Sequence, residues 1–160
     1  MDTITHGIVG ALIGKAFFAD ESSPAPFKWG EPPRTAGRVA IISATLGAIF
    51  PDIDVFAEPF ARNGLGLMTV HRSLTHSIVM LPFWALLLAL LTRWFAGRWK
   101  WPAPRLPVLF GIYAAGLASH IFLDVITSFG TMVWSPISYA RVSWDWVFII
   151  DSPAMCRCCD

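Results

Sequence analysis

The side chains most suited to binding a metal ion in this chain are histidines and aspartates at the ends of apolar segments. Imidazole nitrogens and carboxylate oxygens are ligands for zinc, manganese and iron. Seven such residues, which include every histidine of the chain, are His6, Asp52, Asp54, His71, His76, His120 and Asp124. Because ionisable groups at the ends of hydrophobic helices cost free energy, we expect them to have a function. Their types predict a divalent-metal site, with zinc as the first choice and manganese or iron as alternatives.

The strongest pair is His120 and Asp124, which lie four positions apart in an apolar stretch. On a helix this spacing puts both side chains on one face, within reach of a common ion. The alternative is an aspartate that hydrogen-bonds within the bundle to a histidine partner and binds no metal.

Asp52 and Asp54 form a second pair, directly after Pro51, which ends an apolar segment. In an extended or turn backbone both carboxylates point the same way and could bind one ion or bridge two. One of them could instead act as a general base. On spacing alone, the plainer interpretation is a pair of solvated loop acids.

His71 and His76 form a third pair, five positions apart, which is not the spacing of one helix face. We expect one imidazole on a loop and the other at a helix start, with Thr75 or Ser77 as the N-cap. Arg72, between them, could hold an anionic oxygen such as phosphate and stabilise developing negative charge. A lipid-headgroup or structural contact explains this arginine equally well.

The composition indicates a membrane protein. Of the 160 residues, 55% are hydrophobic and only 14% are charged, and the mean hydropathy is +0.57. Soluble domains carry about 25% charged residues. Eight tryptophans fit the same interpretation, since tryptophan collects at membrane interfaces. The net charge of +1 does not indicate a nucleic-acid-binding surface. Given the apolar composition, the expected partner is the lipid bilayer.

Four apolar segments are expected to form helices that position these side chains: residues 4–19, 39–50, 78–95 and 106–126. The last two are long enough to span a bilayer core, whereas the first two are shorter and could be re-entrant or buried. The first contains Gly10 and Gly14 in a GxxxG pattern, which permits close helix packing in lipid.

The basic residues predict the orientation of this bundle. Residues 20–38 and 93–105 carry seven Lys/Arg, against Arg62, Arg72 and Arg141 elsewhere between the segments. The positive-inside rule puts the two basic loops in the cytoplasm. When the segments alternate in direction, all seven His/Asp residues fall at the opposite end. We therefore predict an all-α, polytopic inner-membrane bundle of about four helices with a one-ended His/Asp cluster, formed by a single domain over residues 1–151.

Four motifs in this order resemble those of a known membrane family. They are Met1-Asp2-x3-His6-Gly7, Phe50-Pro51-Asp52-Ile53-Asp54, His71-Arg72-x2-Thr75-His76-Ser77 and His120-x3-Asp124-x2-Thr127. The set is similar to the membrane-bound metal-dependent hydrolases of bacteria and archaea, including inner-membrane hydrolases described as LexA-regulated. This resemblance implies an integral inner-membrane protein with a divalent-metal site. The His120-x3-Asp124 pair is also similar, by analogy only, to a zinc-binding pair in zinc-dependent phospholipases C.

The chain departs from the family pattern after Asp151, where further apolar sequence is expected. Residues 152–160 instead form a tail with Cys156, Cys158 and Cys159. We interpret this tail as a truncation or frameshift, and a metal-binding C-x-C-C segment is the alternative.

The motifs and the resemblance together predict a membrane-bound hydrolase in which a divalent ion activates water to attack a phosphoester or lipid substrate. As ligands we rank first His71, His76, His120 and Asp124, then Asp52 and Asp54, and last His6. The candidates for a catalytic role are Asp54 and Arg72. One alternative is a non-catalytic membrane protein with a structural metal site or an ion-handling role. Another is a bundle with satisfied polar groups and no metal. The sequence does not predict the oligomeric state.

Overall fold

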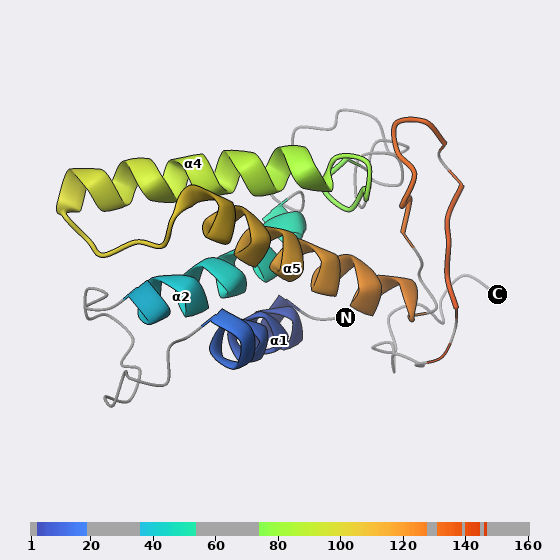
Figure 1. The fold of residues 1–160 in the computed structure, drawn as a ribbon. Helices are drawn as coiled ribbons and strands as arrows, with labels where there is room; N and C mark the ends of the chain where they lie inside the picture. Colours follow the sequence, from blue (N-terminus) through green and yellow to red (C-terminus); the bar gives the residue numbers. More distant parts are fainter. Residues whose placement is uncertain are drawn as a thin grey trace, which may run out of the picture.

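The computed structural model describes residues 3–18, 36–53, 74–127, 131–138, 140–144 and 146. The regular secondary structure of these residues is helical, joined by turns and irregular segments, with an isolated bridge between Thr131 and Val142. Helix α1 (Thr3–Ile13) continues into a π-helical turn, η1 (Gly14–Phe18). It is followed by α2 (Ala36–Ile49), α4 (Leu81–Trp99) and α5 (Leu106–Val125). Helix α2 packs against α1 and α5, and α4 packs against α5 (Figure 1). The prediction of an all-α fold is confirmed for the described residues.

The start of α4 differs from the prediction. The helix begins at Leu81 with Met80 as its N-cap, and no side chain caps it, so the prediction of Thr75 or Ser77 as N-cap is wrong. The physical reason is a competing set of contacts. The Ser77 hydroxyl donates to the carbonyl oxygen of Ser135. The backbone N–H of Ile78 donates to the carbonyl oxygen of Val133. These contacts hold the residues before α4 in a turn.

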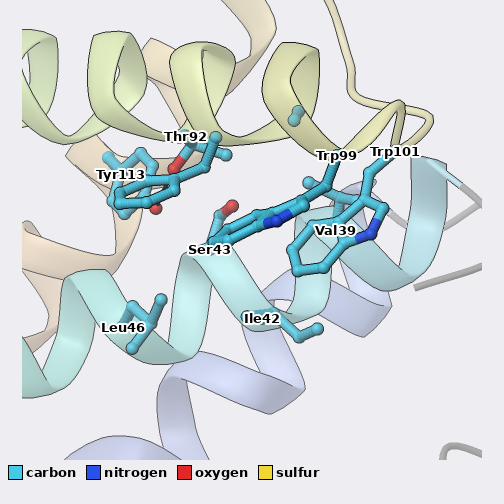
Figure 2. A pocket seen from close by; sticks show the side chains of 10 residues that line it. Val39, Ile42, Ser43, Leu46, Thr92, Trp99, Trp101 and Tyr113 are labelled. Carbon is cyan, nitrogen blue, oxygen red and sulfur yellow. Dashed lines mark hydrogen bonds between the residues drawn. The ribbon is translucent and has the colours of Figure 1, made fainter. Parts of the chain in front are cut away.

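The end of α4 forms a tight cap. Lys100 adopts a left-handed conformation with φ 55°, and the backbone N–H groups of Lys100 and Trp101 both donate to the carbonyl oxygen of Ala96. Pro102 then prevents continuation of the helix. As a result, the indoles of Trp99 and Trp101 lie over the N-terminal half of α2 (Figure 2).

Small residues bring α1, α2 and α5 into close contact. A Cβ atom at Gly10 would lie 2.6 Å from the Cβ of Ala48, and one at Gly116 would lie 2.7 Å from the carbonyl oxygen of Ala44. A Cβ at Gly14 would likewise lie 2.8 Å from the Cα of Ile41. The predicted close packing of the GxxxG pattern is therefore confirmed, and α2 is the helix against which both neighbours pack.

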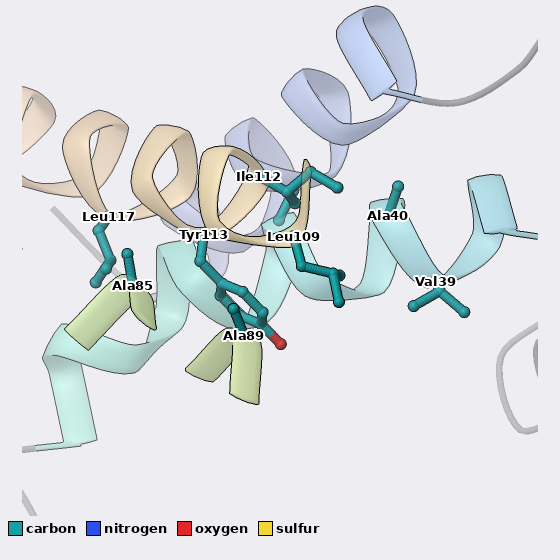
Figure 3. Close-up of a cluster of buried hydrophobic side chains, with 9 residues drawn as sticks. Val39, Ala40, Ala85, Ala89, Leu109, Ile112, Tyr113 and Leu117 are labelled. Carbon is teal, nitrogen blue, oxygen red and sulfur yellow. The ribbon is translucent and has the colours of Figure 1, made fainter. Parts of the chain in front are cut away.

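The apolar core is a narrow seam along α2, α4 and α5 (Figure 3). Helix α4 contributes only alanines to it at full burial, Ala85 and Ala89, while α5 contributes larger side chains. Many of the larger apolar side chains of α4 face outward, with Phe83 58% and Leu90 48% exposed. An outward leucine-rich surface is unusual for a soluble domain and is what a lipid-facing helix presents.

Among the residues that the structure describes, two helical stretches are long and apolar enough to cross a membrane, namely Ala36–Ile53 and Leu106–Val125. The second apolar segment thus reaches spanning length, against expectation, because a 3₁₀ turn over residues 50–53 extends α2. Helix α4, expected to span, is not among the two, since Arg93 and Arg98 occupy its C-terminal turns. Thr3–Phe18 is apolar but shorter. A bundle with four spanning helices stays a prediction.

Candidate metal centre

Five of the seven predicted residues converge at one end of the helices. His6 comes from α1, Asp52 from the turn after α2, His76 from the turn before α4, and His120 and Asp124 from the last turns of α5. The starts of α1 and α4 and the ends of α2 and α5 lie away from the connection between α4 and α5 (Figure 1). Four of the five are fully buried, and the Asp52 side chain is 18% exposed. Asp54, His71, Arg72 and the tail 152–160 lie outside the described residues.

Asp124 lies at the centre of this cluster. Its Oδ1 is 3.3 Å from Nε2 of His6, and its Oδ2 is 3.4 Å from Nε2 of His76 and 3.5 Å from Nε2 of His120. The two Nε2 atoms of His76 and His120 are 3.0 Å apart. Oδ1 of Asp52 lies 3.5 Å from Nε2 of His120. Tetrahedral ligands held about 2.1 Å from a zinc ion are about 3.4 Å from one another, so this spacing suits a shared ion.

The imidazole of His120 is oriented by the end of α2. Its Nδ1 lies 2.6 Å from the carbonyl oxygen of Ala48, which can only accept, so Nδ1 carries the hydrogen. In the neutral ring, Nε2 then presents its lone pair to the cluster. The last carbonyls of a helix lack partners within it, and Pro51 has no N–H to donate. The helix end therefore supplies the acceptor, and histidine ligands of metals typically donate their other N–H in this way.

His76 has a hydroxyl beside its second ring nitrogen. Oγ1 of Thr75 lies 3.1 Å from Nδ1 of His76, and a hydroxyl can donate or accept there. Because the Nε2 atoms of His76 and His120 face each other, at most one of them carries a hydrogen. With Nδ1 protonated toward Thr75, His76 would also present a lone pair to the cluster.

His6 is closer to the cluster than its low rank in the sequence suggested. Its ring stacks on that of His120, with centroids 3.8 Å apart and planes 25° apart. Neither of its ring nitrogens has a hydrogen-bond partner in the described structure, although both are buried. The 3.3 Å approach of its Nε2 to Asp124 lacks the angle of a hydrogen bond. A buried ring nitrogen without a hydrogen-bond partner is suited to bind a cation through its lone pair.

The buried carboxylate of Asp124 needs a compensating positive charge or hydrogen bonds. Protonated imidazoles could supply the charge, and so could a metal ion held by neutral imidazoles. Two overlapping groups, each with ligand atoms within 4.8 Å of one another, could hold an ion: His6, His120 and Asp124, and Asp52, His76 and His120. His120 belongs to both groups. The structure thus provides His/Asp groups that could bind one or two divalent ions.

The sequence did not reveal two of the contacts that orient these rings. The carbonyl of Ala48 sits in an apolar helix and carries no side-chain signal; only Pro51 hints at an unpaired carbonyl nearby. Thr75 was expected to cap a helix, and its hydroxyl lies instead beside His76. Both are contacts across or next to turns, which residue spacing does not encode.

The comparisons with known proteins agree with a membrane location. A family model described as YdjM inner membrane protein matches residues 1–158. An uncharacterized protein of Bacillus subtilis (strain 168), YfhP, is 28% identical over 145 residues, which cover 86% of this chain and 38% of the relative. The chain thus spans well under half the length of that relative. No solved structure matches. The family's description gives a location and no reaction, so metal dependence and hydrolysis stay predictions.

Proposed function

This chain belongs to the YdjM family of inner membrane proteins, and from that premise we propose that its His/Asp cluster is a divalent-metal centre that hydrolyses an ester or phosphoester at the membrane. The observation that carries the proposal is the convergence of three imidazole Nε2 atoms on the Asp124 carboxylate at 3.3–3.5 Å. The Ala48 carbonyl supports it, because it leaves the Nε2 lone pair of His120 directed at the cluster.

The residues fit a divalent ion in number and type. His6, His120 and Asp124 would hold it, and the overlapping group of Asp52, His76 and His120 would complete the set or bind a second ion. Mixed nitrogen and oxygen ligands of this kind suit zinc first, and manganese or iron as alternatives. When bound, such an ion polarises an ester and lowers the pKa of water to near neutrality.

Asp52 has the position of a proton acceptor. Its side chain is the only one of the five that is partly exposed, although its Oδ2 is itself buried and has no hydrogen-bond partner in the described structure. A substrate would therefore approach from the Asp52 side, and the unpartnered Oδ2 could take a proton from a water molecule inside the cluster. Asp54 is the second candidate for this role, and Arg72 is proposed to stabilise negative charge on the substrate. A phosphoester, free or on a lipid, suits that arginine and the membrane location.

A structural metal centre is the second candidate function. The near-complete burial of four of the five residues favours it, because a structural site is closed whereas a catalytic site keeps an open position. In that case the ion would tie α1, α2 and α5 together and no substrate would be turned over.

One experiment tests the proposal and separates these two functions. The full chain is purified in detergent, its metal content is measured, and it is assayed on phosphomonoester, phosphodiester and carboxyl-ester substrates before and after chelation. Bound divalent ion with chelator-sensitive hydrolysis supports the metal-dependent hydrolase. Bound ion without turnover, together with a large loss of thermal stability on chelation, assigns the structural centre. Folded protein with no ion overturns both.

A further inference from the structure

An apolar groove runs between α2, α4 and α5 in the half of the bundle away from the His/Asp cluster (Figure 2). Its volume is about 310 Å³. Val39, Ile42 and Leu46 of α2 form its floor, and Phe95 and Trp99 of α4 form a wall. The lining is almost wholly hydrocarbon and aromatic, which suits an aliphatic chain rather than a polar ligand.

Two hydroxyl groups of the groove are already paired with each other. The hydroxyls of Thr92 and Tyr113, on facing helices, lie 2.6 Å apart and hydrogen-bond to each other. A ligand in the groove therefore need not offer a donor or an acceptor to them. This again favours an acyl chain.

Aromatic rings close the end of the groove at the cap of α4. The ring of Phe95 stacks on that of Trp99 with centroids 5.1 Å apart, and Trp99 lies 5.2 Å from Trp101. Both indoles are partly exposed. Tryptophan in this state is typical of the boundary between hydrocarbon and headgroups, so the mouth of the groove is expected at headgroup level.

A basic pocket adjoins this mouth. Its volume is about 360 Å³, and Arg93, Gly97 and Lys100 line it. It shares Ala96 and Trp101 with the apolar groove, so the two form one continuous surface. Arginine and lysine at a membrane boundary are the residues that recognise phosphate headgroups.

A side-chain hydrogen bond and a backbone conformation hold this basic pocket in shape. One guanidinium nitrogen of Arg93 donates to the carbonyl oxygen of Pro104 at 3.4 Å, which leaves other N–H groups of the five for a ligand. Lys100 occupies a left-handed position with φ 55°, where glycine is the usual residue. A lysine at a position that costs backbone strain is consistent with a need for its ammonium group.

We propose that the groove and the basic pocket together bind one anionic phospholipid, with its phosphate on Arg93 and Lys100 and an acyl chain along the seam between α2 and α4. Charge complementarity and the apolar lining select this occupant over a zwitterionic lipid or a soluble anion. The headgroup lies at the end of the bundle opposite His120 and Asp124, so this lipid is a bound partner and not a substrate of the metal centre. The site does not depend on the proposed hydrolase.

The first test measures lipid binding to the full chain in detergent. Phosphatidylglycerol and phosphatidylcholine with identical acyl chains, each brominated, are titrated while quenching of tryptophan fluorescence is recorded, and native mass spectrometry counts bound lipids. We expect phosphatidylglycerol to bind about 25-fold tighter, since each of the two basic residues, Arg93 and Lys100, contributes about five-fold near a membrane surface. Equal affinity for the two lipids would overturn the proposal, as would full competition by inorganic phosphate alone.

Two variants test the headgroup contact without threatening the fold. Lys100→Gly suits the left-handed position, so thermal stability should hold or rise while phosphatidylglycerol affinity falls about five-fold and phosphatidylcholine affinity is unchanged. Gly97→Leu projects a side chain into the basic pocket, where a Cβ meets no atom within 4 Å. It should weaken phosphatidylglycerol binding.

Gly111→Leu is the matched control, because a Cβ at Gly111 also meets nothing within 4 Å and Gly111 lines neither cavity. It should bind phosphatidylglycerol like the unmodified chain. If Lys100→Gly and Gly97→Leu bind phosphatidylglycerol as well as Gly111→Leu does, the basic pocket is not the headgroup site. Metal content is expected to stay unchanged in all three variants, which separates this result from that of the metal centre.

Discussion

His120 donates its Nδ1 hydrogen to the carbonyl oxygen of Ala48, 2.6 Å away on the last turn of α2. This contact links the two central helices and directs Nε2 of the same ring toward Asp124 and His76. The end of α2 thus determines which nitrogen can bind a cation. The neighbouring Pro51 is part of the same arrangement, because it stops the helix and cannot donate to its carbonyls.

Replacing His120 with alanine should abolish metal retention, because His120 belongs to both groups of candidate ligands. Metal content per folded chain, measured after size-exclusion in detergent, is the readout. Ser119→Ala is the matched control, since the Ser119 hydroxyl donates to the carbonyl oxygen of Gly116 and Ser119 belongs to neither group of candidate ligands. If the His120→Ala protein keeps its full metal content, the ion is bound at another place in the chain.

Replacing Thr75 with valine should weaken metal binding without removing a ligand. The hydroxyl of Thr75 lies 3.1 Å from Nδ1 of His76, and loss of such an orienting contact typically costs about 10-fold or more in metal affinity. Thr75→Ser keeps the hydroxyl and should restore most of the affinity. Titration of the apo-protein with zinc against a chelating indicator gives the constants. Equal affinities for the valine and serine variants would remove Thr75 from the site.

Two substitutions at His6 distinguish a role as a metal ligand from a role in packing. His6→Phe preserves the stacked ring on His120, whereas His6→Ala removes it. If His6 binds the ion, both variants should lose metal affinity to a similar degree, with only the alanine variant losing additional stability through the cavity it leaves. Metal titration and thermal unfolding in detergent provide the two readouts. If the His6→Phe variant keeps the metal affinity that the His6→Ala variant loses, His6 acts only by stacking its ring on His120.

The sequence predicted the helices well because long apolar runs and prolines define their limits. It also predicted that His120 and Asp124 share a face, since four-residue spacing on a helix is a local property. The importance of His6 was missed, because its position depends on how closely Gly10 lets α1 approach α2. The lipid groove was not predictable either. Trp99 and Trp101 indicated an interface, but only their placement over α2 makes them the wall of a cavity.

Replacing Gly116 with alanine should destabilise the protein and loosen the metal centre together. The added Cβ would lie 2.7 Å from the carbonyl oxygen of Ala44, so α5 must move away from α2. Overpacking of this kind costs about 1–3 kcal/mol. Movement of α5 also stretches the contact between His120 and Ala48, so metal affinity should fall in parallel with the melting temperature. Gly111→Ala, on the same helix with open space around the new Cβ, should leave both properties intact or raise stability slightly. A Gly116→Ala protein that melts like the Gly111→Ala control would show that α2 and α5 are not in close contact there.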